Sequence, residues 1–137
     1  MAPAEPSAAE SSAAESSAAD SPAAESQAAV TRIVVQDAVL AHPVTVARIE
    51  TRRITLQPGA PAGLHVHSGP VVGSIETGSV TYQLEGQEER VLRAGDVFFE
   101  PEGERVARFD AGADGVTFLG VFPLAAGQDA AIEFPDR

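Results

Sequence analysis

The sequence predicts an all-β fold, an antiparallel sandwich or small barrel, preceded by a tail that does not fold. Three observations support this prediction. After residue 30, apolar stretches of strand length recur about every 8–12 residues and are separated by Gly, Pro and acidic residues. No window of about 12 residues carries a clean helical stripe, apart from a weak pattern over residues 37–41. The first 29 residues, in contrast, are a repeat of Ala, Ser and acidic residues.

Residues 1–29 repeat with a period of five, and Glu10, Glu15, Asp20 and Glu25 mark that period. Five residues rotate an α-helix by ~500°, so the repeat gives no helix face that could pack on a core. The apolar side chains of this segment are Ala and Met1, which bury too little area to offset the entropy of ordering. We therefore predict a disordered acidic tail over residues 1–29 and one folded domain over residues 30–137.

The predicted strands are apolar runs or stretches in which apolar and polar side chains alternate. Ile54 and Leu56 alternate with polar residues, and so do Val80, Tyr82 and Leu84. Alternating side chains lie on opposite faces of a strand, so Tyr82 is expected in the core with its hydroxyl donating a hydrogen bond. The predicted strand stretches are residues 33–35, 44–49, 53–56, 80–84, 91–92, 97–99, 106–109 and 116–122.

The composition excludes several classes of function. The formal net charge of −11 argues against binding to nucleic acid or to an anionic membrane. The chain has no Cys, which excludes thiol catalysis and Cys-bound metal clusters, and no Lys, which excludes an ordinary phosphate-binding P-loop. It also has neither the basic start nor the apolar run of a secretory signal, so we expect a cytoplasmic protein.

His65 and His67 stand two residues apart in the stretch from residue 59 to residue 78. On a strand, such a pair shares one face with Cα atoms roughly 6.5–7 Å apart, and two imidazoles so placed can bind one metal ion. Residues 95–110 read as a strand, a turn at Pro101 and a second strand that leads back toward the first stretch.

Together these two stretches resemble the two motifs of the cupin superfamily. The first family motif is Gly, five residues, His-x-His, and then Glu and Gly at fixed intervals; the second is Gly, five residues, Pro-x-Gly, and then His and Asn. The resemblance covers roughly residues 44–124 and implies a jelly-roll type antiparallel β-barrel. It also suggests a homodimer that pairs through residues 116–124 and the early strands. The residues in register are Gly59, His65, His67, Gly78, Gly95, Pro101 and Gly103.

The departures from the family pattern affect the metal site that the resemblance implies. In complete family sites, three His and one Glu hold a divalent ion. Here the Glu position falls on Val71 (or Val72), the second-motif His falls on Val106, and the Asn position is Asp110. Valine cannot donate a lone pair to a metal. The resemblance thus implies a degenerate metal site with two ligands, His65 and His67.

Other residues can complete or replace this site. Glu100 and His42 are two possible further ligands, whereas the register turns Glu76 outward. The acidic residues Glu100, Glu102 and Glu104 otherwise read as a solvated turn around Pro101. Two residues after Val106, Arg108 shares its face if the strand is regular and can bind a substrate carboxylate, the alternative being a surface ion pair. In the pair at residues 52–53, we expect one solvated Arg and one paired with an acid.

Three hypotheses of function remain open at this point. The first is a binding protein that holds a small organic molecule with His65, His67, Tyr82 and Arg108. The second is a metal-dependent cupin enzyme of the dioxygenase, isomerase or decarboxylase type, with Fe, Mn, Ni or Zn on His65 and His67. The third is a structural or regulatory module that binds a protein partner.

Overall fold

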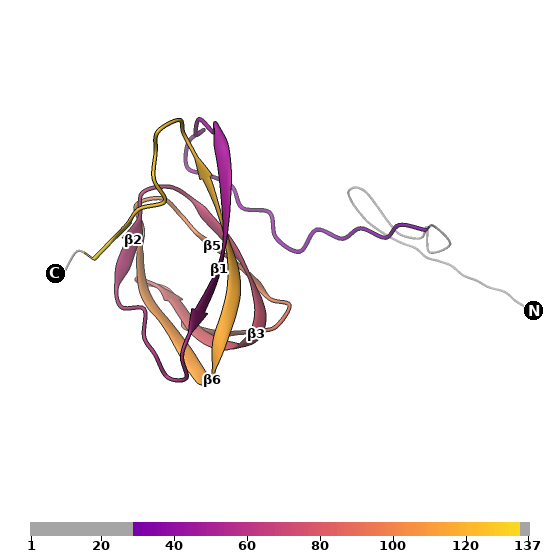
Figure 1. Ribbon diagram of the computed structural model, residues 1–137, viewed down its shortest axis with the longest axis vertical. Helices are drawn as coiled ribbons and strands as arrows, with labels where there is room; N and C mark the ends of the chain where they lie inside the picture. The colour runs from indigo at the N-terminus through magenta and orange to yellow at the C-terminus, as the bar shows by residue number, and fades with distance from the viewer. Residues whose placement is uncertain (1–28, 135–137) are drawn as a thin grey trace, which may run out of the picture. The chain divides into compact units, whose positions relative to one another are not determined.

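The computed structural model describes residues 29–134, and its regular elements are all β-strands. This confirms the predicted fold class. In Figure 1 the long strands β3 and β6 curve around the barrel while β1 runs along one side of it. The seven strands are β1 (Arg48–Leu56), β2 (His65–His67), β3 (Val71–Leu84), β4 (Arg90–Arg93), β5 (Val97–Glu100), β6 (Arg105–Leu124) and β7 (Ile132–Glu133).

The two long strands each take part in two groups of pairings, all antiparallel. The first half of β3 pairs with β5 and with the end of β6, and the end of β6 also pairs with β1. The second half of β3 pairs with β4 and with the start of β6, which also pairs with β2. The register shifts on either side of Gly78, whose φ of 79° suits glycine. A side chain there would overlap the Gly115 carbonyl, so glycine is needed where the strands bend.

The main core is a cluster of aromatic rings around Phe98, which is 1% exposed. Its ring centroid lies 5.8 Å from that of Tyr82, 5.3 Å from Phe109 and 5.8 Å from Phe118. The Phe98 ring occupies the space that a side chain at Gly73, its partner on β3, would fill. A second cluster contains Val71, Phe122 and Leu124.

The segment before β1 differs from the prediction. Residues 33–35 were expected to form a strand, but they form none, and Ile33 and Val34 are 79% and 83% exposed. Residues 37–41 form no helix, and of residues 44–49 only the last two belong to β1. The compact unit that contains the barrel begins at Gln36, whose side-chain amide donates to the Phe98 carbonyl at 3.1 Å. The tail predicted over residues 1–29 lies outside the described residues except for residue 29.

The strand edges bear on the expected homodimer, which stays a prediction. Residues 116–121 are paired on both edges, with β1 and with β3, because this part of β6 is an inner strand of the sheet. Among residues 29–134, β1 pairs with β6 alone, so its other edge has no strand beside it. Ile49 on this strand is 65% exposed.

The described part of the chain contains no helix that could cross a bilayer.

Candidate metal centre

Strand β2 carries the two predicted histidines into the barrel interior. His65 and His67 are 3% and 9% exposed, and Val66 between them is half-buried, as the alternation of a strand requires. The two ring centroids are 5.0 Å apart and the ring planes are nearly perpendicular, at 86°. The histidine pair therefore faces the interior, as the sequence predicts.

The orientation of His65 is fixed by the backbone. Its Nδ1 lies 2.7 Å from the Gly63 carbonyl oxygen. A carbonyl accepts hydrogen bonds and cannot donate them, so Nδ1 carries the proton and donates it. In the neutral ring, the lone pair is then on Nε2, the atom that faces the interior. A metal-binding histidine commonly has this arrangement, in which the second ring nitrogen donates to a carbonyl.

Glu100, at the end of β5, adds a carboxylate to the histidine pair. It is 3% exposed, and its Oε1 lies 2.6 Å from Nε2 of His67 and 3.7 Å from Nε2 of His65. One ligand atom from each of the three residues lies within 4.8 Å of the others. The turn after Glu100 is tied to β2, because the Gly103 N–H donates to the His67 carbonyl at 3.1 Å. This bond keeps the carboxylate beside the histidines.

The strand register explains how the carboxylate reaches this position. Val71, which stands where the resemblance expects Glu, is the direct antiparallel partner of Glu100. Likewise Val106, at the position of the expected third His, is the direct partner of His65. Side chains of directly paired residues lie on the same face of a sheet. The carboxylate beside the two histidines therefore comes from β5, whereas the family motif places it on β3. In both cases the side chain enters the interior of the barrel.

The two sequence interpretations of Glu100 have different outcomes. Glu100 was one of two possible further ligands, and the structure places it in the cluster. The alternative interpretation, a solvated turn, is wrong for Glu100 but correct for Glu102 and Glu104, which are exposed. The available signal was alternation within β5, because Phe98 and Glu100 are buried while Val97 and Phe99 are only half-buried.

The buried charges of the cluster stabilise one another. Burial lowers the pKa of His65, but the Glu100 carboxylate and the Gly63 carbonyl outweigh it, so this pKa lies above its ordinary value. Burial alone would raise the pKa of Glu100, but His65 and His67 lower it below its usual range. The interior of this end of the barrel therefore favours an ionised carboxylate with a positive charge on the histidine side. A divalent cation would satisfy the same requirement.

Apolar side chains form the walls around this cluster. Val106 is fully buried and pairs directly with His65, and Val71, which shares a core cluster with Phe122 and Leu124, pairs directly with Glu100. The Phe122 ring centroid is 6.2 Å from that of His67, and the Phe134 centroid is 6.3 Å from that of His65. Such walls limit the access of water, and the resulting low polarity strengthens electrostatic interactions within the site.

Tyr82 and Arg108, the other two predicted ligand-binding residues, have different surroundings. Tyr82 is in the core and its hydroxyl donates to the Phe99 carbonyl at 2.8 Å, so the predicted core position and donor role are confirmed. Arg108 does not share the face of Val106. A register shift inserts one extra residue of β6 between these two positions, which turns Arg108 outward. There it forms ion pairs with Glu89 and Asp110, the alternative that the sequence left open.

His42, Glu76 and the arginines at residues 52–53 are not members of the three-residue cluster. His42 is exposed and lines a separate pocket of about 220 Å³ with Pro43 and Glu102, so it is not part of the cluster. As predicted, Glu76 lies outside the barrel, where it binds Arg53 at 2.8 Å. Arg52 binds Glu50 on the opposite face of β1. Both arginines of the pair therefore have acidic partners, whereas we expected one to be solvated.

The fold and the cluster define a small β-barrel protein with a candidate metal site inside the barrel. Residues 52–115 match the family model described as the cupin domain. This match, together with a fold shared with solved cupins, confirms the resemblance to the cupin superfamily that the two sequence motifs indicated. A comparison with curated proteins found no match.

Solved structures of similar fold include enzymes and proteins described only by their fold. Oxalate oxidase in complex with the substrate analogue glycolate superposes with a TM-score of 0.54 at 23% identity, covering 63% of this chain and 45% of its own. A DMSP lyase from Ruegeria pomeroyi gives 0.55 at 20% identity over 63% and 42%. A cupin-like protein from Thermotoga maritima gives 0.52 at 23% identity over 63% of both chains. The chain spans less than half the length of the two enzymes, and at these identities the likeness establishes the fold alone.

Proposed function

We propose that the protein is a divalent metal-binding cupin whose ligands are His65, His67 and Glu100. The observation that carries the proposal is the buried carboxylate of Glu100, which is directed at both histidines. Its Oε1 lies 2.6 Å from Nε2 of His67 and 3.7 Å from Nε2 of His65. A buried carboxylate is costly unless a cation or strong donors compensate it. Two histidines and one carboxylate on one side of an ion are typical of non-haem Fe(II) sites, and Mn, Ni and Zn accept the same donors.

The residues present fit such an ion for three reasons. The Gly63 carbonyl holds the proton on Nδ1 of His65 and leaves Nε2 as the ligand atom. His65 and His67 lower the pKa of Glu100, and each ligand has an apolar neighbour: Phe134 beside His65, Phe122 beside His67 and Val71 paired with Glu100. A bound ion would supply Lewis-acid or redox chemistry at its open positions. The chain itself orients the ligands, excludes water and leaves the remaining positions to a small organic ligand.

This proposal favours the second hypothesis from the sequence over the first. The first rested on a degenerate site with two ligands, and Glu100 supplies a third candidate ligand. Metal sites that perform chemistry commonly have three protein ligands and an open position. A small organic molecule remains the expected partner, as with the glycolate bound by oxalate oxidase, a protein of similar fold. The partner-binding module stays a prediction that no observation here favours.

Titration of untagged, metal-free protein with Fe²⁺, Mn²⁺, Ni²⁺ and Zn²⁺ tests the proposal. We expect one equivalent of at least one of these ions to bind, because three donors converge on one point. The His65→Ala variant is expected to lose at least about a hundredfold in affinity, since removing a direct ligand costs more than the 10–100-fold typical of outer-shell partners. His42→Ala, which removes an exposed imidazole, is the matched control and should bind as the wild type does. If His65→Ala and His42→Ala bind equally well, the proposal is wrong.

A further inference from the structure

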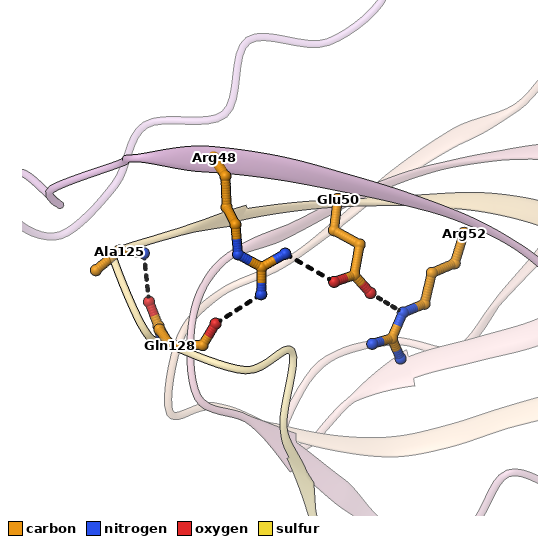
Figure 2. A network of polar contacts seen from close by, with 5 residues as sticks. All are labelled: Arg48, Glu50, Arg52, Ala125 and Gln128. Atoms are coloured by element: carbon orange, nitrogen blue, oxygen red, sulfur yellow. Dashed lines mark hydrogen bonds and ion pairs between the residues drawn. The ribbon is translucent and has the colours of Figure 1, made fainter.

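Three charged side chains of β1 face the same side of the strand as the core residues Ile54 and Leu56. These are Arg48, Glu50 and Arg52, which follow one another at every second position. Figure 2 shows all three pointing to one side of β1, with Glu50 between the two guanidinium groups. The row thus continues the inner face of β1 beyond its apolar part.

Arg52 is the member of this row whose guanidinium lies over an aromatic ring next to His67. Its Cζ lies 5.3 Å from the centroid of the Phe122 ring, and that centroid lies 6.2 Å from the His67 ring. Gly120, the direct partner of Arg52 on β6, has no side chain to separate the guanidinium from this ring. The ring of Phe122 therefore lies close both to the guanidinium of Arg52 and to the candidate ligand His67.

The row carries an unbalanced positive charge. Arg48 and Arg52 share the single carboxylate of Glu50, and Arg48 also donates to the Gln128 carbonyl at 2.9 Å (Figure 2). Arg52 uses only Nε for its bond to Glu50. In the part of the chain that the structure describes, its two terminal nitrogens have no hydrogen-bond partner. Arg52 side-chain exposure is 47%, so these donors are accessible from solvent.

The geometry points to Arg52 as the residue that binds the carboxylate of an organic acid whose other end occupies the metal site. This inference rests on the proposed function, because it assigns the second end of the ligand to the ion. A guanidinium binds a carboxylate through two parallel hydrogen bonds, and the two terminal nitrogens of Arg52 are available for them. The substrate class that fits both ends is a small dicarboxylate. This role replaces the one that the sequence assigned to Arg108, which faces outward.

The test uses the full chain, metal-free and metal-loaded, with malonate, succinate and glutarate as probes in calorimetric titrations. At least one of them is expected to bind the wild-type protein. Arg52→Gln is expected to weaken that binding about tenfold, because it removes a hydrogen bond between the charged guanidinium and the carboxylate of the probe. Arg53→Gln is the matched control, because it removes the same charge from the adjacent residue on the outer face. Glu50→Gln should tighten binding about threefold by removing the acid that competes for Arg52.

The outcomes separate this inference from the proposed function. If none of the probes binds, or if Arg52→Gln and Arg53→Gln weaken binding equally, the inference is overturned. If Glu50→Gln weakens binding, it is overturned as well, since the carboxylate then supports the site instead of competing with the ligand. Metal content is measured in the same samples. Arg52-dependent binding by protein that takes up no metal would contradict the proposed metal function and would overturn the assignment of the acid's second end to the ion, leaving Arg52 as a carboxylate site alone.

Discussion

Replacing Glu100 by Gln is expected to reduce the affinity for a divalent metal by at least about a hundredfold, more than the loss typical of an outer-shell residue. Gln keeps the size of the side chain and one oxygen but removes the negative charge. Two neutral imidazoles then remain as ligands, and the walls contributed by Val71 and Val106 offer no replacement. Isothermal titration with the metal that the wild-type protein binds most tightly measures the change.

Glu102→Gln is the control for this variant. It removes the same charge two residues further along the chain, where the side chain is exposed and lies outside the cluster. We expect the metal affinity of the Glu102→Gln variant to remain within about twofold of the wild type, because salt largely screens a remote charge that is exposed to solvent. Thermal unfolding of both metal-free variants shows whether they are folded. Unchanged metal binding by folded Glu100→Gln protein would exclude Glu100 as a ligand.

Replacing Phe98 by Ala is expected to lower the free energy of unfolding by about 3–5 kcal/mol, the usual cost for a buried aromatic residue. Phe98 is 1% exposed, and its ring contacts three other aromatic rings. Gly73 opposite has no side chain that could move into the cavity. Because Glu100 follows two residues later on the same short strand, we also expect weaker metal binding by this variant. Urea denaturation followed by circular dichroism measures the stability.

Phe99→Ala is the matched control, since it deletes the same side chain from the neighbouring, half-buried position. It is expected to cost at least about 2 kcal/mol less than Phe98→Ala, because its ring leaves a smaller buried cavity. Equal losses of stability for the two variants would show that the aromatic cluster around Phe98 is not the main core of the barrel.

The parts of the fold that the sequence predicts are those in which local pattern and tertiary environment agree. Alternation around Tyr82 and Ile54 gives strands whose apolar faces are the buried ones in the structure. The same period of two places His65 and His67 on one face, and that face is the interior. The apolar stretch at residues 33–35 shows the limit of this reasoning. It has the composition of a strand, but a strand also needs a pairing partner, and composition alone does not supply one.

The third candidate ligand and the orientation of Arg108 depend on pairing between distant strands. Glu100 reaches the site because it pairs with Val71, and that register is set by the antiparallel arrangement of β3 and β5. Arg108 faces outward because one extra residue of β6 shifts the alternation after Val106. A one-residue shift turns every later side chain to the other face, and nothing in the local sequence marks it.

The most direct test of the metal centre is a crystal structure of the metal-loaded protein, with diffraction data collected at the absorption edge of the bound metal. We predict one strong anomalous peak within about 2.0–2.2 Å of Nε2 of His65, Nε2 of His67 and a carboxylate oxygen of Glu100. A peak that lies elsewhere, for example at His42 in the separate pocket, or a loaded crystal without a peak between these three residues, would contradict the account.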